Sequence, residues 1–141
     1  MNKLEFLFFQ LFESLFLTDK VFYRSFRPPL DEDSLNEKLS EFKLQGTGLE
    51  CLFRVRNGNE DYSFNTPEFM SFGYLLSIEE AIRHFKQDDF FVNNKMFPFI
   101  SSLDGSFVSL NIKSKRNSNL LVYSPFIPMI KPESIYDNLE L

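Results

Sequence analysis

Apolar residues recur at helical spacing in the first half of the chain and predict three helices, near residues 2–17, 31–44 and 48–56. Asp31 stands where an N-cap side chain would accept a backbone N–H at the start of the second helix. Thr47 and Glu50 have the spacing of a capping box at the start of the third. Asn57-Gly58 marks its end, because these residues tolerate left-handed backbone.

The pattern changes after residue 68, where short apolar and alternating runs predict strands near 69–76, 96–103, 106–113 and 119–124. Ser77 and Glu80 form a second capping box, which opens a helix over 77–87. Asp104-Gly105 favours a two-residue type I′ hairpin turn. A last helix is expected over 132–141. Helices followed by a mainly antiparallel sheet with packed helices indicate an α+β fold.

Alternation in the strand over 106–113 predicts which side chains face the core. Val108, Leu110 and Ile112 are expected to point inward, whereas Phe107, Ser109 and Asn111 are expected on the other face. Gly73, within the first strand, is expected to mark a bulge or a close backbone approach.

The first 20 residues are rich in Phe and Leu, and we expect an extra helix there. At about 100° per residue, one face carries Leu4, Phe8, Leu11, Phe12 and Leu15, while Phe6 and Leu17 fall among polar residues. The segment is too short and too polar to span a bilayer, and no small-residue cleavage site of a signal peptide follows it. Docking onto the core, binding a partner and lying on a membrane surface are the alternatives.

Composition narrows the function classes. The 141 residues favour a single domain over 1–141. One Cys and one His exclude an internal disulfide, fit a reducing, cytoplasmic location, and leave no set of ligands for structural zinc. The net charge of −5 argues against nucleic acid, because phosphates are bound by Lys and Arg, and favours basic partners or simple solubility. We expect no metal or organic cofactor.

No combination of residues predicts catalysis. We expect Cys51 to be buried and inert, and His84 to lie off the apolar face of its helix. A Cys51 nucleophile would need a base such as His84 nearby in space. Asp88-Asp89 fits a solvated helix end or a carboxylate pair. The cationic group Lys113, Lys115 and Arg116 fits a solvated turn or an anion contact.

The order of motifs resembles the SUKH superfamily, which includes Smi/Knr-type regulators and bacterial immunity proteins. The resemblance covers residues 30–141. It rests on Gly73 to Ala81, a strand followed by an S-x-E-E-A helix, and on Arg56-Asn57-Gly58 after the first helices. It also rests on Phe97 to Ile100, Asp104-Gly105 with the following strands, and Lys131 to Leu141. Asn111 stands where the family often has Asp.

The resemblance implies binding rather than catalysis. Bacterial members are implicated in neutralising polymorphic toxins by direct contact, and eukaryotic members resemble regulatory adaptors. We therefore expect a non-catalytic immunity protein with a basic toxin domain as its partner. The alternatives are an adaptor of the same fold without a toxin, or a small enzyme with an unrecognised site. The candidate partner-binding residues are Glu60, Asp61, Glu68, Asp88, Asp89 and Asp104, which are acidic, with Phe107 and Asn111 on the strand.

Overall fold

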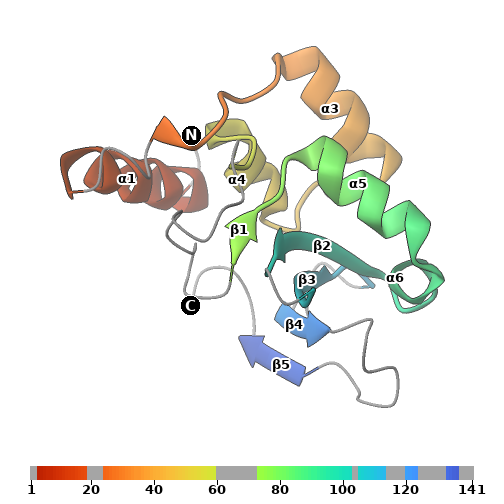
Figure 1. Cartoon of the computed structure of the whole chain (residues 1–141). Coiled ribbons are helices and arrows are strands. Elements are labelled where there is room, and N and C mark those ends of the chain that lie inside the picture. Colours follow the sequence, from red (N-terminus) through yellow and green to blue (C-terminus); the bar gives the residue numbers. More distant parts are fainter. Residues whose placement is uncertain are drawn as a thin grey trace. The chain divides into compact units, whose positions relative to one another are not determined.

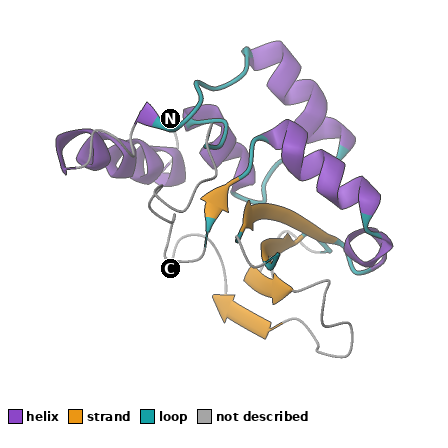
Figure 2. Cartoon of the chain, viewed as in Figure 1, coloured by secondary structure: helices purple, strands orange, loops and turns teal. Residues whose placement is uncertain are grey.

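The computed structural model describes residues 3–18, 24–59, 73–102, 105–113, 120–123 and 133–136. Contacts divide the chain into two compact units, Met1–Pro67 and Glu68–Leu141. The described helices and the antiparallel sheet confirm the α+β class (Figure 2). The single-domain organisation stays a prediction, and each unit is described by itself below.

The N-terminal unit contains three described helices of more than one turn: α1 (Lys3–Thr18), α3 (Glu32–Glu41) and α4 (Leu49–Val55). Both α1 and α3 pack against α4, which is buried over most of its length. Segment 24–30 leads into α3, and Phe26 pairs with Asn59 in an isolated antiparallel bridge. Two backbone bonds flank this bridge, from Arg27 N–H to the Gly58 carbonyl (2.8 Å) and from Asn57 N–H to the Arg27 carbonyl (3.0 Å).

Helix α3 is capped as predicted at its start but ends earlier than predicted. Asp31 Oδ2 accepts the Ser34 N–H at 3.0 Å. At the other end, Lys43 adopts a left-handed backbone conformation (φ 56°). The Lys43 N–H donates to the Ser40 carbonyl, and the Leu44 N–H donates to the Leu39 carbonyl. These two bonds form a Schellman motif, which satisfies the last carbonyls and turns the chain away. The prediction that the helix continues to residue 44 is therefore wrong.

The predicted capping box of α4 is also wrong. The N-cap is Gly48, which has left-handed backbone (φ 96°) and no side chain to cap with. The Thr47 hydroxyl instead donates to the Leu44 carbonyl at 2.6 Å. The Glu50 carboxylate turns back and accepts the N–H groups of Gly46 and Gly48. The Glu50 carboxylate thus binds backbone N–H groups of the loop before the helix and does not form a capping box with Thr47.

The C-terminal unit is built on a five-stranded meander in which every neighbouring pair is antiparallel (Figure 1). Its strands are β1 (Tyr74–Leu75), β2 (Met96–Ser101), β3 (Phe107–Asn111), β4 (Leu120–Tyr123) and β5 (Glu133–Tyr136). The register shifts between Pro98 and Ile100, which accommodates a proline in an interior strand. Gly73 is a close approach, as predicted, because a Cβ there would lie 2.3 Å from the Ser101 carbonyl oxygen.

Two helices, α5 (Ile78–Gln87) and α6 (Asp89–Asn93), pack on β2. The capping box of α5 is confirmed in both directions: Ser77 Oγ accepts the Glu80 N–H and Glu80 Oε1 accepts the Ser77 N–H, each at 3.1 Å. Helix α6 is absent from the sequence prediction. Asp88 creates it by ending α5 and capping α6, where its Oδ1 accepts the Phe90 N–H at 3.0 Å.

The β2–β3 hairpin differs from its prediction in the turn and in the exposure of β3. The Ser102 N–H donates to the Ser106 carbonyl and the Gly105 N–H to the Ser102 carbonyl, so three residues separate the closing pair instead of two. Gly105 has the expected positive φ (89°). Phe107 and Ser109, expected on an open face, are both buried. Phe107 contacts His84 of α5 and Phe91 of α6, with ring centroids 5.0 and 5.4 Å apart.

The end of the described chain is a strand where a helix was predicted. Residues Glu133–Tyr136 pair with β4, with Ser134 opposite Leu121 and Tyr136 opposite Leu120. The helix prediction over 132–141 rested on two apolar residues one turn apart. Backbone pairing with β4 outweighs that weak periodic signal, and Ile and Tyr both favour strands.

Candidate protein-binding surfaces of the N-terminal unit

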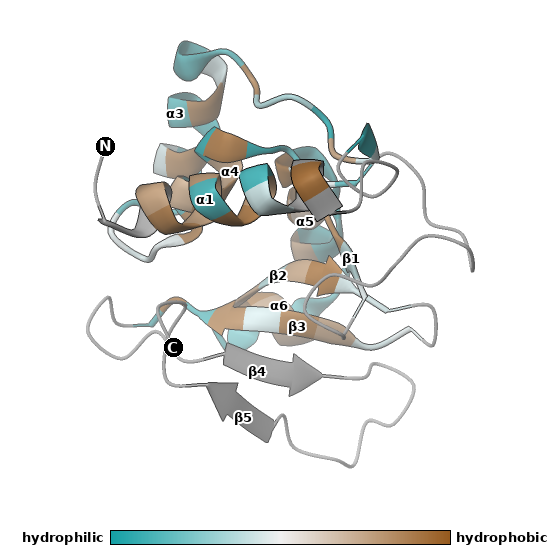
Figure 3. Ribbon diagram, turned by 90° about the vertical axis from the view of Figure 1, so that its left-hand side faces the viewer, coloured by the Kyte–Doolittle hydropathy of each residue, from teal (hydrophilic) through white to brown (hydrophobic). Residues whose placement is uncertain are grey.

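Three carboxylates line one side of α3. Asp33, Glu37 and Glu41 are all exposed and follow one another at intervals of four residues. Residues four apart are neighbours on a helix surface, so these side chains form a single row, which we call the acidic stripe. The opposite side of the helix carries Leu35 and Leu39, which are buried. Figure 3 shows the helix divided between hydrophilic and hydrophobic residues.

The acidic stripe costs the helix stability. Like charges four residues apart destabilise a helix by about 0.2–0.5 kcal/mol per pair, and the stripe contains two such pairs. Glu41 also lies in the last turn, where the helix dipole disfavours an acid. Lys38, three residues before Glu41, is the only basic residue within α3, and this one opposite-charge spacing offsets at most one of the two repulsions. The charge is therefore not explained by the stability of α3.

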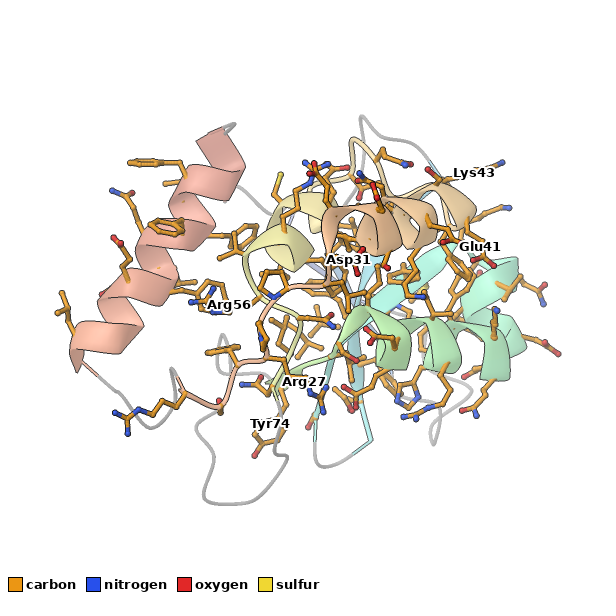
Figure 4. The ribbon with its side chains drawn as sticks, turned by 90° about the horizontal axis from the view of Figure 1, so that it is seen from above. Arg27, Asp31, Glu41, Lys43, Arg56 and Tyr74 are labelled. Atoms are coloured by element: carbon orange, nitrogen blue, oxygen red, sulfur yellow. The ribbon has the colours of Figure 1, made fainter. Side chains whose placement is uncertain are left out.

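The first turn of α3 adds further negative charge but has a local explanation. Figure 4 shows Asp31 and Glu41 near opposite ends of the helix, with Lys43 just beyond. Hydrogen bonds from the backbone and side chain of Ser34 lower the pKa of Asp31. Glu32 and Asp33 lie in the first turn, where the helix dipole favours acids. The acids of the first turn thus support the helix, whereas Glu37 and Glu41 do not.

Helix α1 is attached to its unit through Phe12. The Phe12 ring is buried and meets the Phe26 ring edge-on, with centroids 4.7 Å apart. The guanidinium of Arg56 lies 5.6 Å from the centre of the Phe12 ring, a distance that favours a cation–π contact. Figure 4 shows Arg56 between α4 and α1. The side of α1 that carries Phe12 is therefore docked onto the core, which was one of the three alternatives left open by the sequence.

Several large apolar side chains of α1 are exposed. Phe6 is 51% exposed and Leu17 is 79% exposed, in agreement with the prediction that both fall among polar residues. Leu7, Phe9 and Leu11 are also exposed. Leu11 falls on the same predicted face as Phe12, yet it is exposed whereas Phe12 is buried. Contiguous exposed apolar side chains mark interaction surfaces more often than scattered ones do.

Four of the eight predicted partner-binding residues lie within the described part of the chain, and these four do not form one exposed surface. Glu60, Asp61, Glu68 and Asp104 lie outside the described residues. Asp88 is half-buried and serves as the α6 N-cap, while Asp89 is exposed in the first turn of α6. Asn111 is half-buried and its Oδ1 accepts the Lys113 N–H at 2.9 Å. Phe107, only 9% exposed beneath α5 and α6, is not available as the centre of an interface.

The residues considered for catalysis have ordinary structural positions. Cys51 is buried in α4, as predicted. His84 is half-buried on α5, and desolvation, with the charge of Arg83, lowers its pKa, while Glu80 opposes the shift. Lys113 is exposed, and Lys115 and Arg116 lie outside the described residues. Across the described segments, no group of three His, Cys, Asp or Glu side chains is placed to hold a metal ion.

Two further findings complete the description. None of the helices in the described part of the chain has the length and apolar character needed to cross a membrane. Comparison with protein-family models and with curated proteins finds no match to this sequence.

The acidic stripe was missed by sequence reasoning although its signal is present. The sequence pattern identifies Asp31 as an N-cap and gives Glu37 and Glu41 no role. Placing the acids at about 100° per residue would have separated the capping acids from the stripe. The spacing of four between Asp33, Glu37 and Glu41 is visible in the sequence.

Proposed function

We propose that this chain is a non-catalytic protein-binding domain whose partner is basic, and that the partner is the cognate toxin domain of an immunity pair. The observation that carries the proposal is the acidic stripe of α3, in which Glu37 and Glu41 extend the charge beyond the first turn and create like-charge pairs that reduce helix stability. The net charge of −5 and the resemblance to the SUKH superfamily support the same function.

The chemistry of the stripe defines what the partner must present. Four residues of helix span about 6 Å, so the three carboxylates form a row about 12 Å long. A partner surface with Lys or Arg side chains at a similar spacing would be attracted to it before contact. Complementary charge speeds the encounter between proteins and opposes wrong partners. The stripe is therefore proposed to govern the association rate, and apolar contacts elsewhere would govern dissociation.

The proposal predicts a toxin gene beside this one, and the test is co-expression with the toxin domain which that gene encodes. The wild-type chain should restore growth and co-purify with the toxin. The Glu37→Lys/Glu41→Lys variant should lose most of this protection, although lysine near the end of α3 suits the helix dipole. The control is Glu79→Lys/Asp89→Lys, which makes the same change of charge at exposed positions of α5 and α6.

Each outcome separates the alternatives. Loss of protection in the α3 variant alone supports the proposal. Loss in the control alone moves the binding surface to the Asp88-Asp89 region and overturns the role of the stripe. Persistent toxicity with the wild-type chain, and no complex, rejects the immunity function and leaves the regulatory adaptor.

A further inference from the structure

We propose that a second copy of this chain covers one exposed side of α1, through antiparallel pairing of the two α1 helices. The occupant is identified by charge and shape within the helix itself. At about 100° per residue, Phe6, Phe9, Gln10 and Glu13 fall within a sector of about 120° that also contains the Lys3 position. The side chains of these four residues, from Phe6 to Glu13, are exposed. Leu17 falls in the same sector but lies beyond the paired length. We call this sector the pairing face.

The pairing face is self-complementary when two copies run in opposite directions. In a symmetric pair centred on residue 8, each residue i lies opposite residue 16 − i of the partner helix, in the isologous manner of two-fold dimers. The Lys3 position then lies opposite Glu13 of the second copy, and the reverse pair forms at the other end. Phe6 lies within about one residue rise, 1.5 Å along the axis, of the second copy's Phe9.

The Lys3 position and Glu13 cannot pair with each other within one helix. Lys3 and Glu13 are ten residues apart on a single helix, which separates them by about 15 Å along the axis. The pairing therefore needs a second helix, and the antiparallel direction also aligns the two helix dipoles favourably. A membrane surface fits the face less well, because interfacial helices carry Lys and Arg on their polar side, whereas Gln10 and Glu13 stand here.

The charge swap is the decisive experiment, read by sedimentation equilibrium of the full chain. The wild type should dimerise with a dissociation constant in the micromolar range, since the contact is only one helix long. Lys3→Glu and Glu13→Lys should each weaken dimerisation by about tenfold, because two weak attractions become two repulsions. The double variant should restore dimerisation. Glu at position 3 lies near the start of the helix, where the helix dipole favours an acid, and Lys at position 13 lies in its second half. Helix content should therefore be preserved in both single variants and in the double variant.

A matched apolar pair tests the face itself. Phe6→Gln/Phe9→Gln should abolish dimerisation, whereas Leu7→Gln/Leu11→Gln, on the other exposed side of α1, should leave it within about twofold of wild type. Circular dichroism should report unchanged helix content for both, because Phe12 remains in place.

Three results would overturn the proposal. One is a wild-type monomer at high micromolar concentration. Another is a dimer that both apolar variants weaken equally, or that the charge swap fails to restore. The third is a monomer that sediments with phosphatidylglycerol vesicles through Phe6 and Phe9, which would assign the face to lipid.

Discussion

Glu50→Gln, which replaces one carboxylate oxygen with an NH₂ group, should destabilise the chain more than Glu80→Gln does. Both residues occupy the last position of a sequence that reads as a capping box. At Glu50, however, both carboxylate oxygens are used, one by the Gly46 N–H and the other by the Gly48 N–H at 3.2 Å. The residue is 8% exposed. Glu50→Gln therefore turns an amide N–H₂ toward a backbone N–H.

The magnitude follows from the lost acceptor. A buried donor left without a partner costs about 1–3 kcal/mol, and bonds to charged groups are stronger than neutral ones. Gly46 is exposed and Gly48 is half-buried, so the cost lies toward the lower end of this range. We expect Glu50→Gln to lower the free energy of unfolding by about 1 kcal/mol. Glu80 uses a single oxygen, Oε1, to accept the Ser77 N–H. Because Gln serves in capping boxes as well as Glu does, Glu80→Gln should cost less than about 0.5 kcal/mol.

Two measurements check the comparison. Urea unfolding followed by circular dichroism gives the free-energy difference, and amide hydrogen exchange at Gly46 and Gly48 reports the loop directly. Exchange at these two amides should accelerate in Glu50→Gln and not in Glu80→Gln. If the two variants are equally stable, or if the exchange of both glycines is unchanged, the account of the loop before α4 is wrong.

Three further predictions follow from the C-terminal unit. Phe107→Ala should lower the free energy of unfolding by about 3 kcal/mol in denaturant titrations, because removing a ring packed on His84 and Phe91 leaves a cavity. A cost below about 1 kcal/mol would contradict the burial of Phe107. Gly73→Ala should cost at least about 2 kcal/mol, because its Cβ would overlap the Ser101 carbonyl, and amide exchange in β1 should accelerate; a neutral effect would contradict the close approach. Burial lowers the pKa of His84 below 6.5, so the unfolded chain takes up this proton first as the pH falls. His84 should therefore reduce stability below about pH 6.5. Urea midpoints against pH should show this loss in the wild type and a smaller one in His84→Gln, and identical curves would reject it.

Elements controlled by neighbouring residues could be predicted from the sequence. The α5 capping box needs only Ser77, Glu80 and the helical period between Ile78 and Phe85, all within one short segment. The same spacing misled at Thr47, because Gly46 and Gly48 both adopt positive φ and move the start of α4 by one residue. The pair of glycines around Thr47 was the available warning.

Features controlled by distant contacts could not be predicted. The burial of Phe107 depends on α6, a five-residue helix too short to show a period and created by a single capping residue, Asp88. The strand β5 depends on pairing with β4. For the candidate site, the sequence supplied the charge of α3, but the structure was needed to show that Glu37 and Glu41 stand opposite the buried side of that helix.

The most direct test of the central claim is the effect of Glu37→Lys on stability and binding, measured in the same preparation. The new lysine would lie four residues from both Asp33 and Glu41, so two repulsive pairs become attractive. We expect the free energy of unfolding to rise by about 1–2 kcal/mol. Stopped-flow association with the neighbouring toxin domain should become several-fold slower and less dependent on salt. A variant that is more stable and associates as fast as wild type at low salt would contradict a binding role for the acidic stripe.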